Sequence, residues 1–323
     1  MSTYTISLET QVAGTLRKSR EIAIGPRHVI HLVAAIAATC VLIEMVTARW
    51  SHSFSSYGRR VEVEYAEAAG LRPGGAGKQK SVLIVGNSTL YCGVDASDLR
   101  SRLQPRVDPH ELPLDTTMIE DWYFGLRELF REGAHPDFIV LMLPPGHVAN
   151  MPPPLDETAH YLFGVQDILM VRRVEGISLT ALSNIVFARY STFFGRRASL
   201  RLRVKSGLFP GFQTLARRYM LKSLTPDYSP ALARFRAMKT LCASNGVHLL
   251  FVVPPTHQES DTLGTPIVLE AAESAGVPAA IPVPNSQLSD DKFADGYHLN
   301  REGQKIFTAA LAGFIRKQVE HDF

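Results

Sequence analysis

Short apolar runs alternate along the chain with longer segments in which apolar residues recur at helical spacing. The apolar runs are residues 82–86, 137–143, 247–253 and 277–283, with a weaker one at 105–112. The helical pattern covers residues 95–104, 117–132, 228–245, 265–275 and 301–318. Continuous apolar runs of this length are typical of strands buried on both faces. The alternation therefore predicts an α/β fold, a flavodoxin-like parallel sheet sandwiched by helices.

The alternation stops in the middle of the chain. Prolines at positions 144, 145 and 152–154 exclude a regular helix or a central strand there, and residues 155–225 have no clear strand pattern. We therefore expect one domain over residues 81–323, interrupted by a helical insertion at about 151–225.

A different apolar stretch, residues 29–46, lies near the N-terminus. Only His31 and Glu44, both near its ends, interrupt its 18 residues, and a membrane span needs about 17–25. Four basic residues precede it, so the positive-inside rule leaves the N-terminus in the cytoplasm; they are Arg17, Lys18, Arg20 and Arg27. The expected order is a cytoplasmic tail at 1–27, a transmembrane anchor at 28–47 and a juxtamembrane linker at 48–80, which ends in the glycine-rich stretch 72–80.

Two other interpretations of the apolar stretch remain open. It could be a buried helix of a soluble domain, or a signal peptide cleaved near Val46-Thr47-Ala48. The long leader and the position of Glu44 favour an uncleaved anchor. Anchor and signal peptide both place the remainder outside the cytoplasm.

The composition of the whole chain indicates no particular function, and only the local distribution of charge is informative. The 323 residues are 46% hydrophobic and 20% charged with a net charge of +3, which is ordinary for a folded protein. Three cysteines make no disulfide framework, and no zinc-type His or Cys spacing occurs. We expect no metal and no cofactor.

The insertion is strongly basic. Residues 171–222 contain one acid, Glu175, and eleven lysines and arginines, interleaved with aromatic residues. Such a segment attracts anions. Nucleic acid does not fit an outside location, which leaves a solvated helical cap, docking on anionic lipid headgroups, or binding of an anionic polysaccharide.

Two loops have residues suited to nucleophilic catalysis. Ser88 follows the first strong strand, and ligands of doubly wound sheets bind beyond the carboxyl ends of the strands. Asp295 and His298 lie in one loop just before the last helix. A serine hydroxyl needs a base to accept its proton, and the base needs an acceptor that fixes its tautomer. The pattern predicts Ser88 as nucleophile, His298 as base and Asp295 as its partner.

These loops resemble known motifs. Residues 81–99 and 291–311 are similar to the first and last motif blocks of the SGNH/GDSL hydrolase superfamily, most closely to its bacterial extracytoplasmic branch linked to polysaccharide O-acylation. The resemblance implies an SGNH-type fold and a Ser88–His298–Asp295 triad, with the Ser88 backbone N–H as one oxyanion donor. An α/β-hydrolase is disfavoured because its G-x-S-x-G elbow has leucine at position 90 here.

The chain departs from the SGNH pattern at three blocks. The usual Gly-Asp-Ser is Gly-Asn-Ser, the second block (112–122) has no glycine, and the third block ends in Pro-Pro-Gly-His. A second Pro-Pro-x-His follows the strand at 247–253, so both histidines are candidates for the same cleft, although a surface position is the alternative. The candidates for the oxyanion hole or cleft are Asn87, Thr116, Thr117, Gly146, His147, Asn150 and His257.

The expected function is that of an extracytoplasmic serine esterase or O-acyltransferase. It would act through an acyl-enzyme on an acylated carbohydrate or another acyl ester. The expected location is the inner membrane, with one span and a periplasmic catalytic domain, and a membrane-bound acyltransferase is a candidate partner. The alternative is a non-catalytic envelope component whose degenerate SGNH fold binds glycan, lipid or such an acyltransferase.

Overall fold

A computed structural model describes residues 25–54, 56–74, 79–149, 155–168, 170–171, 177–209, 226–257 and 259–320. The chain divides into two compact units, Met1–Met45 and Val46–Phe323. Helix α1 (Pro26–Phe54) contains the apolar stretch Pro26–Arg49, which has a mean hydropathy of 2.3 over its most apolar window, none of it buried. This helix is long and apolar enough to cross a membrane, and it includes the predicted anchor.

The second unit is built on a parallel five-stranded sheet with the order β2-β1-β3-β4-β5. The strands are β1 (Lys80–Gly86), β2 (Val107–Pro113), β3 (Phe138–Met142), β4 (His248–Val252) and β5 (Ala279–Ala280). This is the flavodoxin-like strand order, so the predicted fold class is confirmed. β5 is shorter than the predicted strand because Pro278 and Pro282 bracket it, and proline donates no ladder hydrogen bond.

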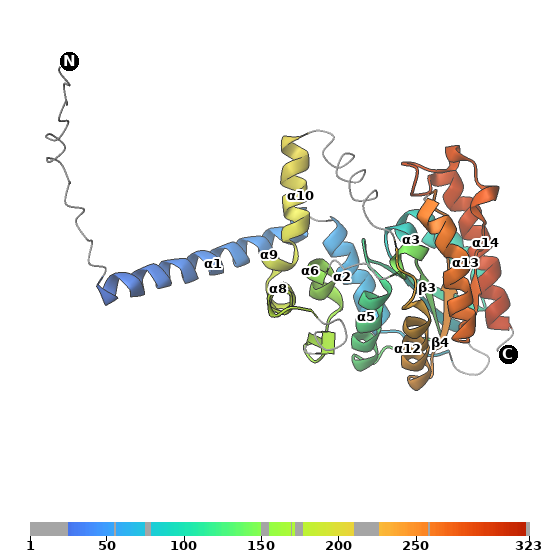
Figure 1. The fold of residues 1–323 in the computed structure, drawn as a ribbon, viewed down its shortest axis with the longest axis horizontal. Coiled ribbons are helices and arrows are strands. Elements are labelled where there is room, and N and C mark those ends of the chain that lie inside the picture. The colour runs from blue at the N-terminus through green and yellow to red at the C-terminus, as the bar shows by residue number, and fades with distance from the viewer. Residues whose placement is uncertain are drawn as a thin grey trace, which may run out of the picture. The chain divides into compact units, whose positions relative to one another are not determined.

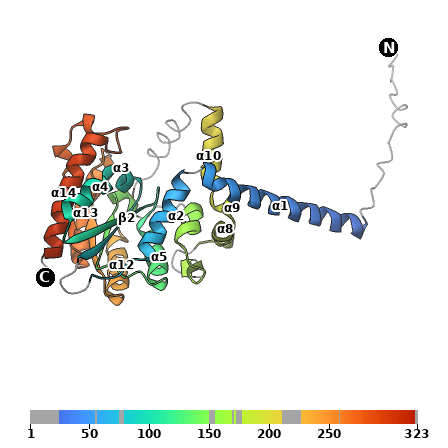
Figure 2. The same ribbon diagram turned by 180° about the vertical axis from the view of Figure 1, so that it is seen from behind.

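Helices cover both faces of the sheet (Figure 1; Figure 2 shows α3, α4 and β2 from behind). α3 (Ser88–Gly93), α4 (Ala96–Leu103) and α14 (Arg301–Glu320) pack on one face, against Val82 and Ile84. α2 (Ser56–Ala69), α5 (Ile119–Arg131), α12 (Ala231–Ser244) and α13 (Glu259–Ser274) pack on the other, against Leu83 and Val85. Because successive residues of β1 point to opposite faces, two apolar layers explain its wholly apolar sequence.

The segment expected as a juxtamembrane linker contains an integral helix. Val61 and Ala68 of α2 are fully buried in the same apolar cluster as α5 and α12, and Leu71 follows them. The linker predicted at 48–80 therefore contains a helix at 56–69, which packs into the apolar core of the second unit.

The described parts of the basic insertion are helical. They comprise α6 (Leu155–Leu162), α8 (Leu179–Tyr190), α9 (Thr192–Gly195) and α10 (Arg197–Leu208). Ser178 and Ser191 cap the starts of α8 and α9 by accepting backbone N–H bonds.

Candidate active site

Ser88 is the first residue of α3, at the carboxyl end of β1. Asn87 caps the helix, because its Oδ1 accepts bonds from the backbone N–H of Thr89 at 2.9 Å and from the Thr89 hydroxyl at 2.7 Å. Gly86 permits this turn, since a Cβ there would lie 2.4 Å from the Met142 carbonyl oxygen of β3. A glycine, an N-cap and a central strand together fix Ser88 at the edge of the sheet where ligands bind.

Ser88, His298 and Asp295 form a continuous relay. Ser88 Oγ lies 2.9 Å from His298 Nε2, and His298 Nδ1 lies 2.9 Å from Asp295 Oδ2. With Nδ1–H donating to the carboxylate, Nε2 is free to accept the serine proton. The structure thus brings together the three residues that the two sequence motifs suggested.

The loop that bears the base is held by its own backbone. Asp295 Oδ1 accepts bonds from the N–H groups of His298 at 2.8 Å and Tyr297 at 3.1 Å, and Gly296 has a φ of +77°. Partial burial raises the pKa of Asp295, but the bonds from His298 and Tyr297 outweigh it and lower the pKa to about 2. Asp295 is therefore ionised at neutral pH and can stabilise an imidazolium at His298.

The loop after β2 is locked onto the end of β1. Leu114 N donates to the Gly86 carbonyl at 2.9 Å, and the Thr117 hydroxyl accepts a bond from Trp122 Nε1 at 2.9 Å. Thr116 has a φ of +62°, in the left-handed region that favours glycine. A β-branched residue in this conformation is strained, and it stands in the block where the SGNH pattern has a glycine.

Thr116 is the better of the two threonine candidates for an oxyanion donor. Its backbone N–H has no hydrogen-bond partner among the residues that the structure describes, whereas Thr117 N–H makes a long 3.5 Å bond to the Leu114 carbonyl. An unengaged N–H in a rigid loop is the kind of donor that can stabilise a developing oxyanion.

One expected donor of the third block, Gly146, is already engaged. Gly146, in the short 3-10 helix Pro145–His147, donates its N–H to Asp261 Oδ1 at 3.0 Å, so this group is already engaged. Asn150 lies outside the described residues. The sequence indicated Gly146 as a candidate oxyanion donor, but no motif indicated that the buried Asp261 carboxylate accepts its N–H.

His147 joins two loops beside Ser88. Its Nδ1 lies 3.0 Å from Asn87 Nδ2 and 2.9 Å from the Thr117 carbonyl oxygen. Burial lowers the pKa of His147, so the ring is neutral. In one tautomer Nδ1 accepts from Asn87, and in the other it donates to Thr117. The first bond holds the turn of Ser88 to the loop after β3, and the second holds that loop to the loop after β2. His147 and Asn87 therefore act as positioning residues.

His257 lies against the segment that leads to the triad loop. Its Nδ1 is 2.9 Å from Asp290 Oδ1, and its ring centroid is 4.0 Å from that of Phe293. It thus contacts residues 290–293 rather than the serine turn. Of the two Pro-Pro-x-His histidines, His147 contacts Asn87 in the turn of Ser88, and His257 packs beside the segment that precedes Asp295.

Asp261, at the start of α13, was not indicated by the sequence. It is 3% exposed and accepts bonds from Gly146 N–H and, at 2.7 Å, from the Thr256 hydroxyl. Burial first, and the Asp261 charge second, raise the pKa of Tyr297 in the triad loop. This carboxylate therefore connects the third block to the segment after β4, and its charge acts on Tyr297, which lies between Asp295 and His298.

Helix α2 also supports the site. The Tyr57 hydroxyl accepts the Asp115 N–H at 3.0 Å, and Arg60 Nη1 donates to the Pro113 carbonyl at 3.3 Å. The Arg60 guanidinium lies 4.1 Å from the ring centroid of Tyr91, in the helix that Ser88 opens. α2 thus holds the loop of the proposed oxyanion donor and the helix of the nucleophile.

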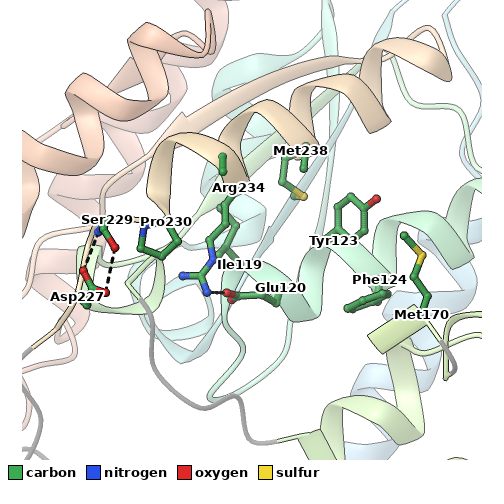
Figure 3. A pocket seen from close by; sticks show the side chains of 12 residues that line it. Ile119, Glu120, Tyr123, Phe124, Met170, Asp227, Ser229, Pro230, Arg234 and Met238 are labelled. Atoms are coloured by element: carbon green, nitrogen blue, oxygen red, sulfur yellow. Dashed lines mark hydrogen bonds and ion pairs between the residues drawn. The ribbon is translucent and has the colours of Figure 1, made fainter. Parts of the chain in front are cut away.

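A cavity of about 650 Å³ lies between α5 and α12. Figure 3 shows Arg234 of α12 directed toward Glu120 of α5, with which it forms an ion pair, and the rings of Tyr123 and Phe124 on the same helix as Glu120. Arg234 also donates to the Val148 carbonyl at 2.7 Å, next to His147.

The described residues contain no cluster of His, Cys, Asp and Glu that could hold a metal ion.

No family model matches the chain, and no curated protein matches it. Its fold is similar to that of LAE5, an α/β hydrolase enzyme from the metagenome of Lake Arreo in Spain, at 10% identity and a TM-score of 0.40, over 75% of this chain and 95% of that one. It is also similar to a putative lipolytic protein of the G-D-S-L family from Desulfitobacterium hafniense, at 8% identity and a TM-score of 0.39, over 73% and 99%. An esterase, EstA from Pseudoalteromonas, matches at 10% identity and a TM-score of 0.39, over 75% and 100%. Likeness at this level does not identify the activity, for which the relay of Ser88, His298 and Asp295 is the evidence.

Proposed function

We propose that this protein is a serine esterase of the SGNH type with Ser88 as its nucleophile. The observation that carries the proposal is the relay of two 2.9 Å contacts from Ser88 through His298 to Asp295. Two loops 210 residues apart in the sequence meet to form it, at the ligand-binding edge of a doubly wound sheet.

The residues account for each step of ester cleavage. Ser88 Oγ attacks the acyl carbon while His298 Nε2 accepts its proton, and the ionised Asp295 stabilises the imidazolium. The N–H groups of Ser88 and Thr116 stabilise the oxyanion. His298 then protonates the leaving alcohol, and an acyl group remains on Ser88. Water attacks that ester with His298 as base, which releases the acid and restores the serine.

The finer proposal is an extracytoplasmic enzyme acting on an acylated carbohydrate. The apolar helix α1 supports a single-pass membrane anchor, and the basic residues before it support a cytoplasmic N-terminus with a periplasmic domain. If a sugar hydroxyl attacked the acylated Ser88 in place of water, the enzyme would be an O-acyltransferase with the same acyl-enzyme intermediate. Nitrophenyl acetate, assayed with and without a sugar acceptor, distinguishes hydrolysis from transfer. Both reactions release nitrophenol, hydrolysis also releases acetate, and only transfer yields acetylated sugar.

A fluorophosphonate probe tests the nucleophile in the full chain. We expect covalent labelling of the wild type and of Ser101→Ala, a control at an exposed serine of α4. Ser88→Ala should not be labelled, and His298→Ala should react at least about a thousandfold more slowly because it lacks the base. Equal labelling of the Ser88→Ala variant would place the reactive serine elsewhere.

A non-catalytic envelope component is the second candidate. It is favoured by one observation: the Gly146 N–H, a potential oxyanion donor, is engaged with Asp261. Wild-type protein that unfolds cooperatively but is not labelled by the probe would support this function, with the fold binding glycan, lipid or a membrane-bound acyltransferase.

A further inference from the structure

Helix α10 exposes a row of large apolar side chains. Leu200, Val204 and Leu208 are 37%, 60% and 68% exposed, and Phe209, which follows the helix, is also exposed. Positions four residues apart lie on one side of a helix, so Leu200, Val204 and Leu208 form a stripe. Exposed apolar stripes of this kind indicate an interaction surface.

A basic stripe runs beside the apolar one. Arg197, Arg201 and Lys205 also recur at intervals of four, and Arg201 and Lys205 are exposed. On a helical projection with 100° per residue, the two stripes together occupy one arc of about 140°. The surrounding segment 171–222 has eleven basic residues and one acid. Aliphatic side chains next to lysine and arginine on one helical face fit an anionic lipid surface, since the apolar groups reach the acyl boundary and the cations meet the headgroups.

The start of α10 is attached to α2. Arg196, immediately before α10, is buried and donates to Glu62 Oε1 of α2 at 2.9 Å. It also lies over Gly58, where a Cβ would be 2.8 Å from Arg196 Nη1. The stripes therefore begin beside the first turns of α2.

Chain length keeps this surface close to the end of the apolar helix. Gly58 is nine residues beyond Arg49, the last residue of the apolar stretch, and nine fully extended residues span at most about 32 Å. If α1 spans a membrane, the start of α10 stays within about that distance of its surface in every orientation of the domain.

We propose that the face of α10 formed by Leu200, Arg201, Val204, Lys205 and Leu208 docks on the anionic surface of the membrane that holds α1. This inference rests on the proposed anchor. An anionic glycan is a poorer fit, because sugars are bound through polar and aromatic side chains, whereas the stripe of Leu200, Val204 and Leu208 is aliphatic. Docking would hold the second unit at the membrane through a second contact besides its anchor.

Hydrogen exchange of the full chain in lipid nanodiscs tests the docking. We expect amides of residues 200–209 to exchange on the order of tenfold more slowly in discs of phosphatidylcholine with phosphatidylglycerol than in phosphatidylcholine alone. The double variant Val204→Asp, Leu208→Asp should lose this difference. The matched control Leu263→Asp, Ile306→Asp, at exposed apolar positions of α13 and α14, should keep it.

The same measurement separates the anchor from the docking. Slow exchange of residues 29–46 in both kinds of disc reports an inserted anchor. With the anchor inserted, equal exchange of 200–209 in both kinds of disc overturns the docking alone. Protection by a soluble anionic polysaccharide, such as alginate, and not by anionic discs also overturns it in favour of glycan binding. Rapid exchange of 29–46 overturns the anchor and the docking together.

Discussion

The substitution Asp295→Asn removes the function of the base while leaving its loop in place. Asparagine retains an Oδ1 that can accept the N–H groups of Tyr297 and His298, as the carboxylate does at 3.1 and 2.8 Å. Its NH₂ then lies where Asp295 Oδ2 was, 2.9 Å from His298 Nδ1. Because NH₂ only donates, Nδ1 must become the acceptor and the ring proton moves to Nε2, which faces Ser88.

The expected cost follows from this change of tautomer. An imidazole with its proton on Nε2 cannot accept the Ser88 proton, and the loss of this relay costs about 10⁴-fold in kcat, or about 5.4 kcal/mol in the barrier. KM should change little, because Asp295 faces the imidazole rather than the reacting ester. The measurement is kcat and KM on an aryl acetate, together with the rate of fluorophosphonate labelling.

Asp291→Asn is the matched control. Asp291 lies in the same loop region and bonds to Lys292, but it has no place in the relay, so kcat should stay within about twofold of the wild type. An Asp295→Asn variant that folds normally and keeps a tenth or more of the wild-type kcat would refute the role assigned to this carboxylate.

Three further substitutions test the supporting structure. Thr116→Gly removes the strain of a φ of +62° and should stabilise the protein by about 1 kcal/mol with labelling at Ser88 retained; a lower melting temperature would contradict this. Gly86→Ala places a Cβ 2.4 Å from the Met142 carbonyl and should destabilise the fold by about 1–3 kcal/mol in denaturant unfolding, an unchanged midpoint being the contrary result. Glu111→Gln tests the effect of a buried carboxyl, because burial raises the pKa of Glu111 to about 8. The unfolded chain releases this proton near pH 4.5 and the folded chain near pH 8. The free energy of unfolding of the wild type therefore falls as the pH rises through that window. The variant lacks this loss and should gain on the order of 1–2 kcal/mol over the wild type between pH 5 and 8, whereas parallel curves of melting temperature against pH would rule the explanation out.

The sheet was predictable because its strands are apolar on both faces. The runs at 82–86, 137–143 and 247–253 correspond to β1, β3 and β4, and alternation with helices gives the parallel order. Helix α2 was missed because its polar residues, such as Arg60 and Glu64, bond to each other along the helix and mask a narrow apolar side. The glycine-rich residues 72–80 after α2 are typical of a linker, and α2 was included in the predicted linker because its own pattern did not indicate a buried helix.

The site was predictable only where its chemistry is local. Asp295 and His298 are three residues apart, so one loop contains both the base and its acceptor. The engagement of Gly146 with Asp261 depends instead on residues 115 positions apart, which no motif connects. The left-handed backbone of Thr116 was also hidden, because threonine rarely adopts this conformation and glycine is the usual signal for it.

The contacts of α2 decide what a protease could release. A cut between α2 and β1 would separate Tyr57 and Arg60 from the loop and helix they hold, and would take Val61 and Ala68 out of the apolar core. The shed fragment would therefore be less stable, and the helix that Ser88 opens would lose the support of Arg60. A cut before Ser56 would instead leave α2 attached to the rest of the second unit. Release of an intact second unit is thus confined to cleavage between Arg49, where the apolar stretch ends, and Ser56, where α2 begins.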